Sequence, residues 1–190
     1  NGGKFAGCWD FYGSDHTKLN RDNVFVLKLV EKYLKNESVK IDKNSVYISG
    51  ISSGGGVALN LLCLAPDVFA GGGLVATTAI GTDVTEILSV PRSVESHVKV
   101  CNEFAKQNNL QAFFSNQVVS LIYDENDYFV NHKHSLMNLE MFKNIYDLKI
   151  KKSIEFSEIN ENKNKGNIDI YSDDKSNRLS VIMNKNLGHN

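Results

Sequence analysis

The sequence predicts an α/β protein with a mostly parallel sheet and helices on both faces. Short β-prone runs alternate along the chain with segments whose apolar residues recur at helical spacing. Apolar residues make up 42% of the 190 residues and charged residues 23%, as in ordinary globular domains. An alternating order of strands and helices favours parallel strands joined by helices that return over the sheet. We therefore expect residues 1–190 to form a single domain.

Four helices and four strands are predicted. Between Asp22 and Leu34, apolar residues fall three and four positions apart, and lysines and a glutamate occupy the opposite face. The second helical segment stops before Pro66, which cannot continue a helix. The predicted helices span 22–34, 54–64, 92–107 and 134–146, and the predicted strands span 46–49, 72–77, 118–123 and 179–183.

Two stretches and the two ends lack such a pattern. Residues 1–19 are rich in glycine and aromatic residues and predict a loop. Residues 160–178 are rich in Asn, Lys and Asp, and we expect a solvated loop or hairpin insertion there. The sequence begins at Asn1 with neither a methionine nor a signal peptide, and it ends directly after a strand-like run. We expect flanking segments of the same protein to be missing from it.

Charge and cysteine content narrow the function classes. Lys and Arg number 21 and Asp and Glu 22, so the formal net charge is −1. This balance argues against a general nucleic-acid-binding protein, which needs a basic excess. No apolar run approaches the ~20 residues that span a bilayer. Cys8, Cys63 and Cys101 are too few for a disulfide scaffold and leave at least one cysteine unpaired within the chain. A bridge from Cys8 to a partner outside the chain stays open.

The most informative motif joins a predicted strand to a predicted helix. Gly50-Ile51-Ser52-Ser53-Gly54 matches G-x-S-x-G, the pattern of a nucleophile elbow in that context. An elbow holds its serine in strained backbone geometry, and strand and helix approach so closely that a Cβ at either glycine is expected to clash. Ser52 is the candidate nucleophile. The N–H of Ser53 then lies at the helix N-terminus, where unpaired donors and the helix dipole stabilise an oxyanion.

Two other interpretations of this turn stay open. It is either a Gly/Ser-rich turn that only packs tightly, or a phosphate-binding turn at a helix N-terminus. The phosphate interpretation is weaker, because no lysine follows as in a P-loop and no G-x-G-x-x-G is complete.

An acid and a histidine should follow the nucleophile, in that order. After the strand 118–123 come Asp124, Glu125 and Asp127, and we choose Asp127 because the loop needs a few residues to turn back toward the sheet edge. His189 follows the last predicted strand in a glycine-containing loop, where a catalytic base belongs. The alternative is that these carboxylates are solvated and that His189 is a mobile terminal residue.

The remaining histidines are assigned no catalytic role. His132 and His134 begin a predicted helix, where we expect them to face solvent or cap the helix. His16 and His97 lack a partner pattern and are expected at the surface or half-buried. No H-E-x-x-H motif, no closely spaced cysteine pair and no larger histidine cluster is present, so the sequence predicts neither a metal site nor a cofactor.

Several segments share an order and spacing over nearly the whole chain. They are residues 7–11, 21–25, 46–55, 66–70, 123–130 and 187–189. Together they resemble the polyhydroxybutyrate depolymerase-like esterases, a family of α/β-hydrolases with feruloyl and acetylxylan esterase relatives. The resemblance implies an α/β-hydrolase fold and a catalytic triad of Ser52, Asp127 and His189.

The sequence departs from this family at three places. Tyr123-Asp124 stands where the family has His-Gly, and Asn190 follows the histidine where a small residue and then Trp are usual. The family's first strand, whose His-Gly-Cys-type turn donates the second oxyanion-hole N–H, is absent. It is expected upstream of Asn1, or downstream in a circular permutation. Because losing one donor typically lowers the rate ~10²–10³-fold, we expect the chain alone to be a weak or inactive enzyme.

The sequence thus predicts a serine-dependent carboxylic ester hydrolase, polyhydroxyalkanoate depolymerase-like, that acts through an acyl-enzyme on a small-molecule or polymeric ester. Trp9 and Tyr128 are the candidate substrate-binding residues, although such aromatics are also common at core and edge positions. Feruloyl and acetyl-sugar esters stay open as substrates. The alternative is a catalytically impaired binding or structural domain of the same fold. By analogy with the family, the protein is expected to be extracellular or periplasmic.

Overall fold

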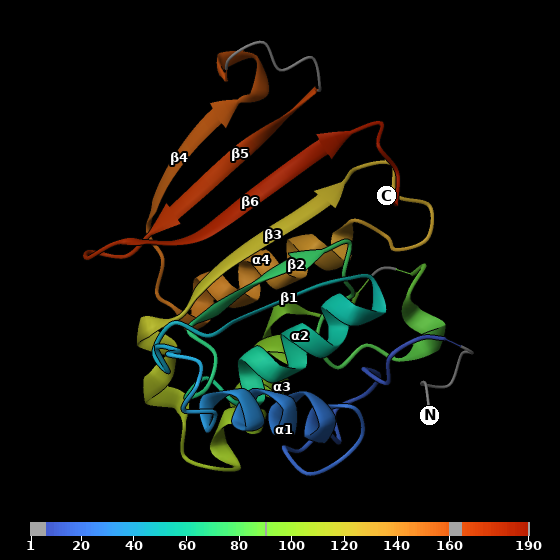
Figure 1. The fold of residues 1–190 in the computed structure, drawn as a ribbon. Helices are drawn as coiled ribbons and strands as arrows, with labels where there is room; N and C mark the ends of the chain where they lie inside the picture. The colour runs from blue at the N-terminus through green and yellow to red at the C-terminus, as the bar shows by residue number, and fades with distance from the viewer. Residues whose placement is uncertain (1–6, 90, 160–164, 190) are drawn as a thin grey trace.

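The computed structural model describes residues 7–89, 91–159 and 165–189, whose six strands form one sheet with the helices gathered on one side of it (Figure 1). The strands are β1 (Tyr47–Ile51), β2 (Gly71–Val75), β3 (Val118–Asp124), β4 (Ile150–Glu155), β5 (Lys165–Ser172) and β6 (Asn177–Lys185). Their order in the sheet is β1-β2-β3-β6-β5-β4. The pairs β1–β2, β2–β3 and β3–β6 are parallel. Strand β5 pairs antiparallel with both β6 and β4.

Each predicted helix is present, with small shifts at its ends. The helices are α1 (Asn23–Leu34), α2 (Ser53–Leu64), α3 (Val94–Lys106) and α4 (Lys133–Ile145), and short 3₁₀ helices cover Val84–Glu86, Gln111–Asn116 and Phe156–Glu158. The four predicted strands correspond to β1, β2, β3 and β6. Within the described ranges, no helix combines the length and the apolar character that a membrane crossing requires.

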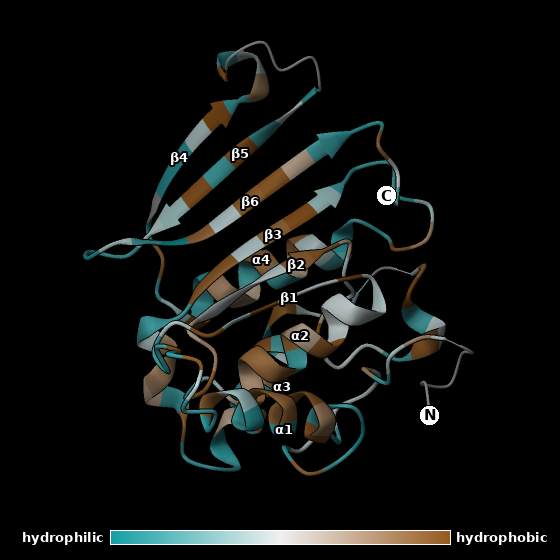
Figure 2. Ribbon diagram, viewed as in Figure 1, coloured by the Kyte–Doolittle hydropathy of each residue, from teal (hydrophilic) through white to brown (hydrophobic). Residues whose placement is uncertain are grey.

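The helices cover one face of the sheet. Leu74, Leu121 and Val181 lie side by side across β2, β3 and β6 and are buried in the same core as α2, α3 and α4. Ten of the 12 residues of α2 are buried, and nine of these ten are glycine or apolar residues, as expected for an enclosed helix (Figure 2). Helices on both faces are the sequence expectation, but the described helices form a single layer.

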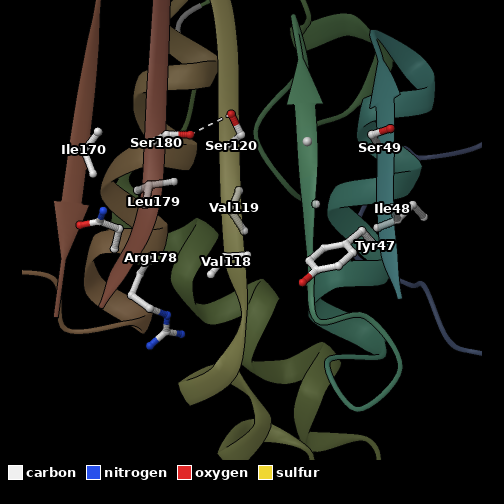
Figure 3. A pocket seen from close by; sticks show the side chains of 13 residues that line it. Tyr47, Ile48, Ser49, Val118, Val119, Ser120, Ile170, Arg178, Leu179 and Ser180 are labelled. Atoms are coloured by element: carbon white, nitrogen blue, oxygen red, sulfur yellow. Dashed lines mark hydrogen bonds between the residues drawn. The ribbon is translucent and has the colours of Figure 1, made fainter. Parts of the chain in front are cut away.

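The opposite face of the sheet is open. Ser49, Gly73, Ser120 and Ser180 follow one another across the strands and line a pocket of about 510 Å³ (Figure 3). Ser180 Oγ of β6 donates to Ser120 Oγ of β3 at 2.9 Å, so these two hydroxyls on the open face form a hydrogen bond with each other. A mostly parallel sheet is normally covered on both faces. In the part of the chain that the structure describes, no helix covers this face.

Of the two expectations for residues 160–178, the hairpin is confirmed where the structure describes that range, and the solvated loop is wrong for most of it. Residues 165–172 form strand β5, and a turn at Asp173 leads directly into β6. Ile168 and Ile170 alternate with Asn167 and Asp169, which is the period of a strand, but the surrounding Lys and Asn residues obscured it. Residues 160–164 lie outside the described residues. The antiparallel strand β4 was not predicted.

One disulfide ties the helical layer together. Cys63 of α2 is bonded to Cys101 of α3 across a sequence separation of 38, and Cys8 is free. Closing a loop of this length is worth about 4 kcal/mol of stability in the chain-entropy model. The pairing was not predicted, because helices distant in sequence bring these cysteines together.

Candidate active site

Ser52 occupies a strained turn between β1 and α2. Its backbone angles are φ 54° and ψ −123°, a conformation that L residues rarely adopt. The Ser52 N–H donates to the carbonyl of Val75 at 2.9 Å, and the Thr77 hydroxyl donates to the Ser52 carbonyl at 3.3 Å. Two bonds from β2 and the loop after it therefore hold the turn in place at the carboxyl end of the sheet.

The two glycines of the motif have different tasks. A Cβ on Gly50 would lie 2.3 Å from the backbone carbonyl carbon and oxygen of Gly54, so only glycine fits at that position. A Cβ on Gly54 would meet nothing closer than the Trp9 ring at 3.8 Å, an ordinary contact. The expected clash at both glycines is wrong for Gly54, because the tight approach is made by the strand residue toward the helix backbone.

The N-terminus of α2 presents unpaired donors beside Ser52. Ser53 is the first helical residue, and first-turn N–H groups have no acceptor within a helix. Ser52 makes no side-chain capping bond, and the first turn of α2 carries no acidic residue. The positive end of the helix dipole is therefore left for another anion, as the elbow interpretation requires.

A carboxylate and a histidine from distant loops form a pair. Asp127 Oδ2 lies 2.8 Å from Nδ1 of His189. The other oxygen of Asp127 accepts the N–H groups of Phe129 at 2.8 Å and Val130 at 2.9 Å, and 2% of the side chain is exposed. Both carboxylate oxygens thus have partners, and the Asp127 bond fixes the orientation of the imidazole.

The structural role of Asp124 was not predicted from the sequence. It is buried at the end of β3, and its Oδ2 accepts the N–H of Leu187 at 2.7 Å. Its Oδ1 accepts the N–H of Asn126 at 2.7 Å. Asp124 thus holds the segment that carries His189 and shapes the loop that carries Asp127. Its position as the last residue of a buried strand was the available signal.

Ser52 and His189 line the same pocket of about 280 Å³. Its lining is mainly apolar. Two of the lining residues, Phe129 and Val130, come from the loop that also holds Asp127. Apart from Ser52 and His189, the lining residues are Cys8, Phe11, Tyr12, Ser53, Thr78, Ile87, Phe129 and Val130. The structure therefore brings together the serine, the histidine and, through the histidine, the carboxylate that were selected from the sequence.

The two predicted substrate-binding aromatics lie outside that lining. Trp9 is half exposed and lines a neighbouring pocket of about 600 Å³, which also borders Ser52 and Gly54. Tyr128 is 68% exposed, and its ring contacts the Phe129 ring in a tilted arrangement, with 4.7 Å between ring centroids. Phe129, and not Tyr128, is the member of this pair that reaches the smaller pocket.

No family model matches the sequence. Over 141 residues the chain is 32% identical to poly(3-hydroxybutyrate) depolymerase from Ralstonia pickettii, a match that covers 73% of this chain and 28% of that protein. Acetyl xylan esterase from Aspergillus awamori superposes with a TM-score of 0.76 at 13% identity, over 98% of this chain and 69% of its own. The poly(3-hydroxybutyrate) depolymerase structure from Penicillium funiculosum gives a TM-score of 0.56 at 18% identity, over 78% of this chain and 40% of its own.

The chain belongs to the α/β-hydrolases that resemble poly(3-hydroxybutyrate) depolymerase and acetylxylan esterase. The two structural matches show the fold, and the match at 32% identity shows sequence similarity to a poly(3-hydroxybutyrate) depolymerase. This α/β-hydrolase chain spans 28% of the length of that curated relative. The activity of the whole protein is therefore a matter of proposal.

Three histidines of this α/β-hydrolase are buried, against expectation. His134, expected to face solvent or cap α4, lies under the loop after β2, where its Nδ1 accepts the N–H of Ala79 and its Nε2 donates toward the carbonyls of Glu86 and Ile87. His97, on α3, donates from Nδ1 to the carbonyl of Ile80 at 2.7 Å. These two rings fix the loop that supplies one wall of the smaller pocket.

The third buried histidine anchors the N-terminal aromatic loop. His16 donates from Nε2 to the carbonyl of Tyr12 at 3.0 Å, and its Nδ1 lies 3.2 Å from the amide nitrogen of Asn23. Gln107, which directly follows α3, donates to the His16 carbonyl. The loop that contributes Phe11 and Tyr12 to the pocket is thus attached to α1 and α3. The sequence offered no sign of this, because all partners are distant or on the backbone.

These histidines make folding stability depend on pH. Burial lowers the pKa of His16, His97 and His134 below the ordinary value of 6.5. Each therefore takes up a proton on unfolding once the pH falls below about 6.5, which favours the unfolded state. We expect the free energy of unfolding, measured with urea, to keep its full value above that pH and to decrease toward pH 5. Each histidine contributes at most about 1.4 kcal/mol per pH unit.

The variant His97→Gln should have a shallower decline between pH 6.5 and pH 5 than the wild type. An identical slope in the two proteins would contradict a role of His97 in this pH dependence.

The described residues contain no group of three or more His, Cys, Asp and Glu side chains arranged to hold a metal ion.

Proposed function

We propose that this α/β-hydrolase cleaves carboxylic esters with Ser52 as nucleophile and an acyl-enzyme intermediate. The observation that carries the proposal is that His189, which is paired with Asp127, lines one pocket together with the strained Ser52. A hydroxyl is a weak nucleophile unless a neighbouring base takes its proton. With Nδ1 of His189 directed to Asp127, Nε2 is the nitrogen that can receive the Ser52 proton.

Each step then has a group to perform it. Ser52 Oγ attacks the ester carbonyl as its proton passes to His189, and the buried Asp127 stabilises the resulting imidazolium. The Ser53 N–H and the positive end of α2 stabilise the oxyanion. His189 returns the proton to the departing alcohol. It then activates a water molecule, which releases the acyl group from Ser52.

The second oxyanion donor is proposed to come from a segment of the same protein outside these 190 residues. Within the described sheet, β1 has a neighbour on one side only. The pocket lined by Trp9 runs along this side of β1, past Ser52 and Ser53. A further strand placed beside β1 would end next to the elbow and so deliver a backbone N–H to the oxyanion. The exposed Phe25, Leu29 and Tyr33 of α1 support this, since they form an apolar stripe that no described segment covers.

The proposed substrate is an ester with a small, apolar acyl group. Phe11, Ile87, Phe129 and Val130 give the smaller pocket its apolar lining, and a volume of about 280 Å³ suits a short acyl chain. The 32% identity to a poly(3-hydroxybutyrate) depolymerase favours a polymeric or oligomeric hydroxyacyl ester over a feruloyl or acetyl-sugar ester. Trp9 and Tyr128 are proposed to contact the part of the substrate that extends beyond the pocket.

An extracellular or periplasmic location is proposed for the protein. The disulfide between Cys63 and Cys101 supports it, because structural disulfides form and persist in oxidising compartments.

A fluorophosphonate probe tests the nucleophile directly. The probe reacts covalently with an activated serine hydroxyl, and peptide mapping by mass spectrometry identifies the residue. We expect the label on Ser52, and none on Ser53, although both lie at the elbow. Absence of labelling at Ser52 in the folded chain would favour the catalytically impaired binding domain instead.

The choice of carboxylate gives a second test. Asp127→Asn keeps the shape of the side chain but removes the charge that stabilises the imidazolium, and we expect kcat for p-nitrophenyl butyrate to fall about 10⁴-fold. Glu125→Gln is the matched control, because Glu125 is exposed two residues away in the same loop. Similar losses in the two variants would argue against Asp127 as the acid.

A further inference from the structure

A second chemical feature lies far from the proposed active site, in the loop between α1 and β1. Residues 35–45 are all exposed and form turns without helix or strand. This loop contains Asn36-Glu37-Ser38, the one Asn-x-Ser/Thr triplet in the 190 residues. Such a triplet, with a residue other than proline in the middle, is the acceptor pattern for N-linked glycosylation.

The local hydrogen bonds arrange the triplet as an acceptor. Ser38 Oγ donates to Oδ1 of Asn36 at 2.7 Å, and the Ser38 N–H donates to the same oxygen at 3.1 Å. The backbone of Asn36 is also engaged, with its N–H on the carbonyl of Tyr33 and its carbonyl on the N–H of Val39. The amide nitrogen of Asn36 makes no hydrogen bond within the described part of the chain. The reacting nitrogen is thus left free on an exposed turn.

The position of the loop leaves room for a glycan without covering the active site. The loop precedes Tyr47, so it lies at the amino end of β1, whereas Ser52 follows the carboxyl end of the same strand. A modification there is separated from the pocket by the length of β1. The disulfide between Cys63 and Cys101 is consistent with passage through an oxidising secretory compartment.

We propose that Asn36 is a site of N-linked glycosylation when the protein passes through a secretory compartment with oligosaccharyl-transfer activity. The donor is a lipid diphosphate-linked oligosaccharide. Asn36 Nδ2 forms the bond to the anomeric carbon of the first sugar, the bond from that carbon to the diphosphate oxygen breaks, and one amide proton is lost. The lipid diphosphate is the leaving group.

The test is secretion of the chain from eukaryotic cells behind a cleavable signal peptide, followed by peptide-N-glycosidase treatment and mass spectrometry. We expect one glycan, whose removal converts Asn36 to aspartate. Asn36→Gln and Ser38→Ala should abolish the modification, and Ser38→Thr should keep it. Asn44→Gln is the matched control, because Asn44 is exposed in the same loop but is followed two residues later by Val46. It should leave the glycan in place.

Secreted, folded chain without a glycan at Asn36 would overturn the proposal, as would a glycan that persists in Ser38→Ala. The thermal unfolding midpoint of Asn36→Gln, measured on bacterially produced protein, should match the wild type, since the side-chain bonds at this turn are exposed. A matching midpoint excludes misfolding as the reason for a lost glycan in that variant.

Discussion

Ser52→Ala is expected to abolish turnover of p-nitrophenyl butyrate, with a loss in kcat on the order of 10⁶-fold when the rest of the catalytic site is complete. Without the Oγ, neither attack on the carbonyl nor the acyl-enzyme is possible, and Asp127 and His189 have no hydroxyl to activate. The residual rate should be that of the oxyanion donors and substrate binding alone. The measurement is initial rate against substrate concentration, with the wild type at the same pH.

Ser53→Ala is the control for this loss. Ser53 is proposed to act through its backbone N–H, which alanine retains, so kcat should change little. Circular dichroism should show the same unfolding transition in both variants, because neither hydroxyl makes a hydrogen bond with any of the residues that the structure describes. Retained turnover in Ser52→Ala would remove Ser52 from the mechanism, whatever the geometry around it.

Gly50→Ala is expected to lower the free energy of unfolding more than any other substitution proposed for this protein. The added Cβ would lie 2.3 Å from the backbone of Gly54, and neither backbone segment can move without separating β1 from α2. Overpacking against a flexible side chain typically costs 1–3 kcal/mol, and a rigid backbone neighbour raises that cost, so we expect about 3 kcal/mol or more. That is a large fraction of the 5–15 kcal/mol that stabilises a typical domain. Urea denaturation measures the change, and fluorophosphonate labelling of Ser52 should be lost with it.

Gly54→Ala should have the opposite effect. Its Cβ would only touch the Trp9 ring at 3.8 Å, and alanine is favoured over glycine in a helix by up to about 1 kcal/mol. We expect unchanged or slightly raised stability. Equal destabilisation by both alanines would show that the close approach in the elbow is not centred on Gly50.

The sequence was sufficient where the signal is local. G-x-S-x-G between a strand and a helix predicts the elbow, because the backbone geometry of the turn depends on residues within it. The helices were predicted from apolar spacing, since α3 and α4 each bury one stripe and α2 buries nearly its whole surface. Strand β5 was expected only as part of one of two alternatives, because a half-buried strand near the sheet edge tolerates Lys, Asn and Asp on its exposed positions.

Buried polar side chains were the hardest to anticipate. His16, His97 and His134 were assigned to the surface or to a helix cap, but each fixes a loop by hydrogen bonds to backbone groups. Backbone partners carry no sequence signature, so these burials cannot be inferred from residue types. The disulfide between Cys63 and Cys101 is similar, because its cysteines meet only when α2 packs on α3.

The sequence by itself determined the strained serine turn. It also narrowed the choice of the candidate catalytic acid to a few neighbouring carboxylates. The tertiary structure decided that Asp127 contacts His189 across 62 residues, while Asp124 secures the segment carrying that histidine. The physical reason is that the ends of β3 and β6 meet only after the sheet has formed. The direction in which a loop carboxylate points depends on the pairing of β3 with β6 and not on the residues next to it in the chain.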